Sequence, residues 1–270
     1  MISKGKPVAI GVIGAGVMGE ALISALIAAG VTPSSITISE KRKDRALELV
    51  SRYGVSRVDL AQNVATSDAI LLVVKPQDMA AVLLEIRGSI KPDTLIISFA
   101  AGKHIQFISS HLGGSNPVIR VMPNTPTLVG EGMAAISIGP GVSLAQSEFV
   151  RGFLAATGRV VEVTEDLQDA VTAVSGSGPA YFFYFVESMV KAGTELGLSN
   201  EVATELTVQT IVGAAKLLAT SDKSATILRE NVTSPNGTTA AAIASFNSAD
   251  LARIVKNAMI AARDRSQELA

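Results

Sequence analysis

The chain has 270 residues, 48% of them hydrophobic, and its 23 basic and 24 acidic residues leave a formal net charge of −1. This length fits two domains or one large one, and the hydrophobic fraction is ample for a packed core. With no basic cluster beyond residues 41–43, neither nucleic acid nor an anionic membrane is an expected partner. The absence of cysteine excludes disulfides, thiolate nucleophiles and cysteine-ligated metals, and it fits a cytoplasmic protein. We expect no metal site.

The first part of the chain alternates short β-rich apolar runs with helical segments. We expect strands at residues 8–13, 36–39, 69–74, 95–98, 118–122, 134–138 and 160–163. Between them we expect helices at residues 18–29, 44–53, 77–86 and 144–156. This alternation is typical of an α/β fold with a parallel-rich, doubly wound sheet of the Rossmann type.

After residue 165 the strand pattern ends. Helical segments follow at residues 167–174, 179–196, 201–219, 224–230, 239–246 and 250–268. We therefore predict a dinucleotide-binding domain at residues 1–163 and an all-α domain at residues 164–270. The later helices are apolar on most faces, so we expect the second domain to form the interface of a homodimer. No apolar stretch is expected to reach the roughly 18 residues that a membrane span needs.

A glycine-rich turn, Gly14-Ala15-Gly16-Val17-Met18-Gly19, joins the first expected strand to a helix. In a dinucleotide-binding fold the first glycine makes the tight turn, the second lets the backbone approach a pyrophosphate, and the third lets the helix pack on the strand. The start of the helix then binds the phosphates. A tight strand-helix turn without a ligand is the structural alternative.

The second expected strand ends in Ser39-Glu40-Lys41-Arg42, where such folds recognise the adenosine ribose. Ser39, Lys41 and Arg42 suit a 2′-phosphate, whereas Glu40 suits a free 2′-hydroxyl. We expect NADPH, with NADH as the alternative.

Two later strand ends would face the same crevice, since ligands lie outside the carboxyl ends of the strands. Lys75, before Pro76, could reach a ribose or a phosphate, and the small side chains of Ala100 and Ala101 could let a nicotinamide lie flat. Ordinary strand-helix punctuation is the alternative for each.

Residues 230–239 read Glu-Asn-Val-Thr-Ser-Pro-Asn-Gly-Thr-Thr and lead into an expected helix. Unpaired N–H groups at a helix start carry partial positive charge, and Gly237 would let a ligand approach the backbone. The hydroxyls of Ser234, Thr238 and Thr239 could aim at a small polar molecule. An N-capped turn without a ligand is the alternative.

These motifs, together with the sequences MPNTP at residues 122–126 and SGSGPAY at 175–181, resemble the pyrroline-5-carboxylate reductase family over essentially the whole chain. The resemblance implies NAD(P)H-dependent reduction of the cyclic imine 1-pyrroline-5-carboxylate to L-proline, the last step of proline biosynthesis. It also implies cytoplasmic dimers that often assemble into decamers.

The motifs and the resemblance together predict two sets of site residues. The expected cofactor-binding residues are Ile13, Gly14, Ala15, Gly16, Val17, Met18, Ser39, Lys41, Arg42, Asn63, Val74, Lys75, Pro76, Ala100 and Ala101. The expected substrate-binding residues are Glu165, Asn231, Ser234, Gly237, Thr238 and Thr239. The resemblance implies that Thr239 is the catalytic residue nearest the imine nitrogen. The family usually has Pro-Gly-Gly where this chain has Pro235-Asn236-Gly237, which matters only if residue 236 has a positive φ, and asparagine tolerates that conformation.

Hydride reduction of a C=N bond depends on orientation and fixed dipoles rather than on a covalent nucleophile. His104 and His111 lie outside the motifs, and we expect neither to take part.

A β-hydroxyacid dehydrogenase is the main enzymatic alternative, but its catalytic lysine is missing, since Lys191 is the first cation after the glycine-rich turn at residues 176–178. A regulatory protein that binds a dinucleotide without turnover is the alternative from another class.

Overall fold

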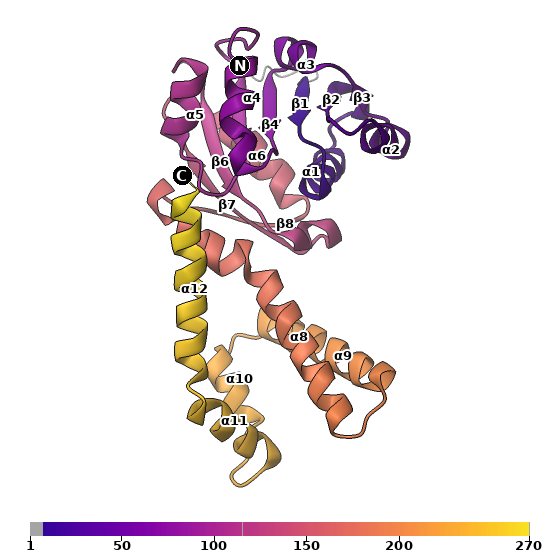
Figure 1. Cartoon of the computed structure of the whole chain (residues 1–270), viewed down its shortest axis with the longest axis vertical. Helices are drawn as coiled ribbons and strands as arrows, with labels where there is room; N and C mark the ends of the chain where they lie inside the picture. Colours follow the sequence, from indigo (N-terminus) through magenta and orange to yellow (C-terminus); the bar gives the residue numbers. More distant parts are fainter. Residues whose placement is uncertain (1–7, 115, 270) are drawn as a thin grey trace. The chain divides into compact units, whose positions relative to one another are not determined.

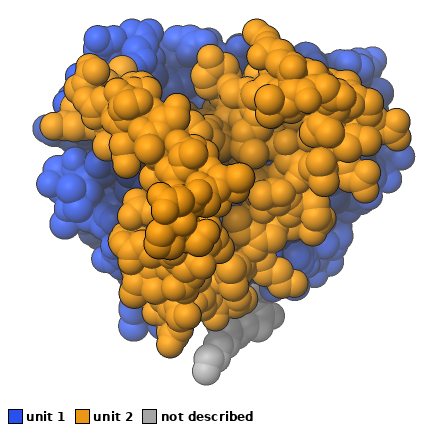
Figure 2. Space-filling model, turned by 90° about the horizontal axis from the view of Figure 1, so that it is seen from below, with its two compact units in different colours: residues 1–177, 262–270 blue, residues 178–261 orange. Residues whose placement is uncertain are grey.

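The computed structural model describes residues 8–114 and 116–269, so the first seven residues of the expected domain 1–163 lie outside the described residues. The chain forms two compact units (Figure 2). The first ends at Ser177 and also takes in residues 262–270, and the second comprises residues 178–261. The segment after residue 164 packs with the first unit because Gln168 is fully buried there and donates to the Ala135 carbonyl and the Ser137 hydroxyl.

The first unit is built on an eight-stranded sheet with the order β3-β2-β1-β4-β5-β6-β7-β8 (Figure 1). The strands are β1 (Ile10–Ile13), β2 (Ile36–Ser39), β3 (Ser56–Arg57), β4 (Ala69–Leu72), β5 (Leu95–Ser98), β6 (Val118–Met122), β7 (Gly132–Ile138) and β8 (Gly158–Glu162). Neighbouring strands are parallel except β6 and β7. The strand order reverses between β1 and β4, and such a reversal opens a ligand crevice at the carboxyl ends of the strands. The Rossmann-type fold class is confirmed.

Helices cover both faces of this sheet. They are α1 (Val17–Ala28), α2 (Lys43–Tyr53), α3 (Leu60–Thr66), α4 (Met79–Ile86), α5 (Ile105–Leu112) and α6 (Leu144–Ala155). Successive strand residues point to opposite faces, so the sheet has two cores. Leu71 packs in one core with Leu22 of α1 and Phe153 of α6, and Ile70 packs in the other with Leu83 of α4.

Three elements of this unit were not expected from the sequence. The strand β3 has two exposed residues, and α3 and α5 have seven and eight residues, so none of them carries a long periodic pattern. The helix expected at residues 167–174 is instead a 3-10 turn (Glu165–Leu167), a short α7 (Gln168–Val171) and a π-helical turn (Thr172–Gly176). Irregular turns of this kind have no simple apolar period.

The second unit consists of helices with few buried side chains. It holds α8 (Gly178–Glu195), α9 (Asn200–Thr220), α10 (Ala225–Asn231), α11 (Thr238–Ser248) and the first part of α12 (Leu251–Glu268). Ala203 is 2% exposed, whereas Phe183, Tyr184 and Leu206 are 63%, 72% and 54% exposed. Apolar surface on this scale marks a protein interface, in agreement with the expected role of the helical part.

The helix α9 passes a length and composition test for a membrane span, with a mean hydropathy of 1.2. The expectation that no stretch would do so is therefore wrong. The sequence hid the feature because glutamate, threonine and glutamine stand between the large apolar residues of α9 and break up its apolar runs. An interface or core helix passes the same test, so a single such helix is weak evidence for a span.

Candidate functional site

A cavity of about 700 Å³ lies at the carboxyl ends of β1, β2 and β4. That size suits a cofactor or a small-molecule ligand. Of the expected cofactor-binding residues, it brings together Ile13, Gly14, Gly16, Val17, Met18, Ser39, Lys41, Arg42, Val74 and Lys75. The remaining ones, which do not line it, are Ala15, Asn63, Pro76, Ala100 and Ala101. Ala15 is fully buried beneath the turn, Pro76 begins a 3-10 turn, and Ala100 follows the neighbouring strand β5.

The glycine-rich turn has the geometry that a dinucleotide needs. Gly14 has φ +86°, and a Cβ there would lie 2.7 Å from the Val73 carbonyl oxygen. A Cβ on Gly19 would lie 2.5 Å from the Gly14 carbonyl oxygen, so this glycine lets α1 approach the turn. Gly16 faces open space and precedes α1, whose start has no side-chain cap. Free N–H groups at a helix start bind phosphate, so these residues fit the diphosphate of NAD(P)H.

Asn63 acts inside the protein rather than at the cavity wall. Its side chain is fully buried, donates from Nδ2 to Ser39 Oγ at 2.9 Å, and accepts at Oδ1 from Thr37 Oγ1 at 2.8 Å. The Ser39 hydroxyl donates in turn to the Val58 carbonyl at 3.2 Å. Ser39 and Val58 both line the cavity, so this hydroxyl stands at the cavity wall. Asn63 therefore positions Ser39.

The ribose end of the cavity carries both signs of charge. Glu40 accepts from the Ala15 N–H at 2.8 Å and from the Arg42 N–H at 2.9 Å. The Arg42 side chain is 64% exposed, and its Nε lies 4.0 Å from Glu40. Arg57 at the end of β3 also lines the cavity. Sequence reasoning missed Arg57, because a two-residue edge strand leaves no pattern to read.

Glu165, expected at the substrate, belongs to the first unit, where its carboxylate has several partners. It accepts from the Ile105 N–H at 2.6 Å and lies 3.5 Å from Arg120 Nη1 and 3.8 Å from His104 Nδ1. The Arg120 side chain is 2% exposed, and its Nη2 lies 3.7 Å from Asp169. Burial lowers the pKa of Arg120, and the two carboxylates oppose that shift. This cluster holds the segment after β8 against β6.

The other expected substrate residues lie together in the second unit, on the loop between α10 and α11. Asn231 ends α10, and Gly237 is the N-cap of α11, with its N–H donating to the Ser234 carbonyl at 3.0 Å. A Cβ on Gly237 would lie 2.5 Å from Ser234 Oγ. Thr238 and Thr239 begin the first turn of α11, and because the N-cap Gly237 has no side chain, no side chain of that residue caps the helix start. This helix start can receive a carboxylate.

The two remaining motifs contact each other and serve structure. Asn124 accepts from the Met133 N–H at 2.8 Å and donates to the Ser175 carbonyl at 3.2 Å. A Cβ on Gly176 would lie 2.4 Å from the terminal methyl of Met122, so a side chain there would require Met122 to shift. The motif at residues 122–126 therefore holds the π-helical turn that precedes α8. Within the described residues, no group of three or more histidines and carboxylates could hold a metal ion.

Comparison with known proteins agrees with both halves of this description. The family model described as NADP oxidoreductase, coenzyme F420-dependent, matches residues 9–102, and the one described as pyrroline-5-carboxylate reductase dimerisation matches residues 165–269. Pyrroline-5-carboxylate reductase from Pseudomonas aeruginosa is 43% identical, over 97% of this chain and 96% of its own length. The helix α9 lies inside the dimerisation match, so a subunit interface explains its apolar character.

Two solved structures are similar over nearly their full lengths. A pyrroline-5-carboxylate reductase from Coxiella burnetii has a TM-score of 0.89 and 34% identity, covering 98% of this chain and 99% of its own. The Plasmodium falciparum pyrroline carboxylate reductase, solved with NADP bound, has a TM-score of 0.87 and 30% identity, covering 97% and 98%. The chain belongs to the pyrroline-5-carboxylate reductase family and is an NAD(P)H-dependent, homo-oligomeric oxidoreductase that reduces 1-pyrroline-5-carboxylate to proline.

Proposed function

We propose that the start of α11 receives the substrate carboxylate and that Thr239 forms a hydrogen bond with the imine nitrogen. The observation that carries this proposal is the start of α11, which is open because its N-cap, Gly237, has no side chain to cap it. Backbone N–H groups there carry partial positive charge and attract a carboxylate. The Thr238 and Thr239 hydroxyls stand on the same first turn.

When bound, NAD(P)H supplies the hydride that adds to the imine carbon. Thr239 contributes a fixed dipole beside the nitrogen: its hydroxyl donates to the nitrogen when the proton comes later from solvent, and accepts from the N–H when the proton arrives with the substrate. A preorganised dipole of this kind stabilises the transition state without reorganisation. Asn231 and Ser234 complete the polar loop around the substrate. Glu165 is not the carboxylate anchor, because two carboxylates repel each other.

Thr239→Val tests this assignment, because it keeps the shape of the side chain and removes the hydroxyl. We expect kcat to fall by about tenfold to a thousandfold, with the Kd for NADPH unchanged. Ser234→Ala and Thr238→Val are the comparison variants, and both should mainly raise the KM for pyrroline-5-carboxylate. A Thr239→Val enzyme with the parental kcat would refute the role of Thr239.

We propose that the cofactor preference is for NADPH over NADH. Lys41, Arg42 and Arg57 provide three cations at the ribose end of the cavity, and each charge-assisted contact with a phosphate contributes about 1.5–3 kcal/mol. Ser39 lines the same end of the cavity, and its hydroxyl can turn from the Val58 carbonyl toward a phosphate. Glu40 is the group that a free 2′-hydroxyl would use instead.

The specificity constants of both cofactors decide this point. Arg42→Ala should lower kcat/KM for NADPH by about tenfold, the loss of one such contact, and leave the value for NADH near that of the parent. Glu40→Gln is the matched variant and should lower the value for NADH more than the value for NADPH, because Glu40 also accepts from the Ala15 N–H of the turn. Equal constants for the two cofactors in the parent would overturn the preference and favour Glu40 as the ribose partner.

We propose that the homo-oligomer is a dimer, able to assemble into a decamer, and that it works in the cytoplasm without nucleic acid or membrane partners. The exposed aromatic side chains of α8 support an interface through the helical unit. Light scattering should give at least twice the chain mass of 27.9 kDa. A monodisperse, active monomer would contradict the dimer, and recovery of the protein in a membrane fraction would contradict the location.

A further inference from the structure

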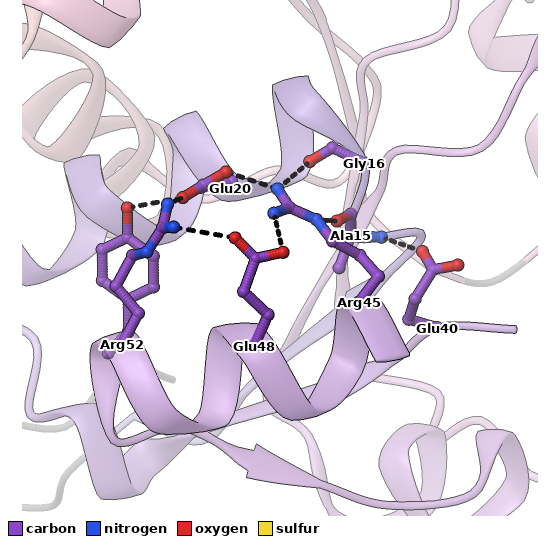
Figure 3. A network of polar contacts seen from close by, with 8 residues as sticks. Ala15, Gly16, Glu20, Glu40, Arg45, Glu48 and Arg52 are labelled. Carbon is purple, nitrogen blue, oxygen red and sulfur yellow. Dashed lines mark hydrogen bonds and ion pairs between the residues drawn. The ribbon is translucent and has the colours of Figure 1, made fainter. Parts of the chain in front are cut away.

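Arg45, which the sequence did not single out, contacts the backbone of the glycine-rich turn. Arg45 lies on α2, and its side chain is 12% exposed. Its Nε donates to the Ala15 carbonyl at 3.2 Å, and its Nη2 lies 3.5 Å from the Gly16 carbonyl oxygen (Figure 3). Arg45 therefore contacts the backbone of the turn without lining the cofactor cavity.

These two carbonyl contacts orient the N–H groups that a diphosphate would meet. A trans peptide is planar, so the carbonyl of one residue and the N–H of the next point in opposite directions. Holding the Ala15 and Gly16 carbonyls toward Arg45 therefore turns the N–H groups of Gly16 and Val17 away from it. Gly16 has no side chain and no atom within 4 Å of a built Cβ, so packing cannot set its orientation. Backbone contacts must do so.

Arg45 is itself fixed by carboxylates on two helices. Its guanidinium is hydrogen-bonded to Glu20 in the first turn of α1 and to Glu48 on α2 at 2.7 Å (Figure 3). Glu20 also accepts from Arg52 and from the Tyr53 hydroxyl. A carboxylate so close to the start of α1 would repel a bound diphosphate if it were unpaired. The two arginines pair it.

We propose that Arg45 is a positioning residue for dinucleotide binding, which orients the peptides at Ala15–Gly16 and Gly16–Val17 and pairs the charge of Glu20. Because it does not line the cofactor cavity, its loss should weaken the hold on the diphosphate and leave the chemical step intact. Arg52 supplies a matched comparison. It shares both carboxylate partners, Glu20 and Glu48, but has no contact with the turn.

The test compares Arg45→Ala, Arg45→Lys and Arg52→Ala in the whole enzyme. The Kd for NADPH, measured by its fluorescence, should rise by about tenfold or more in Arg45→Ala and by less than about twofold in Arg52→Ala. At saturating NADPH, kcat and the KM for pyrroline-5-carboxylate should stay within about twofold of the parent in both. Arg45→Lys keeps the charge but loses the planar fork, so its Kd should lie between those of the parent and Arg45→Ala.

Two competing ligands separate positioning from a general loss of structure. The affinity for 2′-phospho-ADP-ribose, which contains the diphosphate, should fall in Arg45→Ala, while the affinity for adenosine 2′-phosphate, which lacks it, should not. Equal losses for both ligands, or the same Kd for NADPH in Arg45→Ala and Arg52→Ala, would overturn the proposal. If Arg45→Ala does not fold, Arg45→Lys serves as the test. The proposal would then be overturned if Arg45→Lys bound 2′-phospho-ADP-ribose and NADPH with the same Kd values as the parent.

Discussion

Asn236 stands in the loop before α11 with φ +60°, a left-handed backbone that side chains rarely adopt. The sequence left open whether this position needs a positive φ, and the structure shows that it has one. Asparagine tolerates this region better than other residues with a side chain, and a β-branched residue tolerates it worst. Replacement by valine should therefore strain the turn, whereas replacement by glycine should not.

The cost follows from the backbone conformation alone, because Asn236 is exposed. The left-handed region costs about 1–2 kcal/mol for an ordinary L-residue, so Asn236→Val should destabilise the loop by about that amount. Asn236→Gly removes the strain, which stabilises the fold, but it also gives the unfolded chain more conformational freedom, which destabilises the fold by roughly 0.4–1 kcal/mol. Its net effect should be close to zero.

The strain should also reach the substrate. Gly237 follows at once and begins α11 as its N-cap, so a shift at residue 236 moves the N–H groups that we propose as the carboxylate anchor. We expect Asn236→Val to raise the KM for pyrroline-5-carboxylate several-fold and to lower the thermal midpoint by about 2–4 °C per kcal/mol lost. Asn236→Gly should match the parent in both. A valine variant with parental KM and midpoint would refute the reasoning.

Three further outcomes are expected. Burial by itself would raise the pKa of Glu20, but hydrogen bonds from Arg45, Tyr53 and Arg52 outweigh it and lower the pKa below its usual value. The ionised Glu20 therefore stabilises the fold at neutral pH, and this stabilisation is lost as the pH falls through the lowered pKa. Chemical denaturation should therefore separate Glu20→Gln from the parent at neutral pH and not in acid, and a gap that widened in acid would contradict this. Arg120→Met should cost about 3 kcal/mol of unfolding free energy, because it removes the cation that faces the buried Asp169 and the partly exposed Glu165, and a variant as stable as the parent in urea would show that their other hydrogen bonds suffice. Phe153→Ala should cost about 3–5 kcal/mol through the cavity that it leaves in a fully packed core, with cofactor Kd unchanged.

Local patterns in the sequence predict most of the architecture. The glycine-rich turn, the buried strands and the long helices of the second part each have a signal that spans a few adjacent residues. For this reason the Rossmann-type fold, the dinucleotide site and the helical half could be predicted, and the family motifs pointed to the reaction. The exposed side chains of α8 likewise agree with the interface expected from their apolar pattern.

Tertiary structure decided which side chains meet. Asn63 donates to the Val12 carbonyl across 51 positions of sequence and proved to support Ser39 rather than to line the cavity. Arg45 reaches the Ala15 carbonyl across 30 positions, and Arg57 enters the cavity from a strand too short to predict. A periodic pattern reports whether a residue faces the core or the solvent, but it says nothing about the distant backbone group that a long polar side chain will reach. Those pairings depend on how strands and helices pack, and only the folded chain determines them.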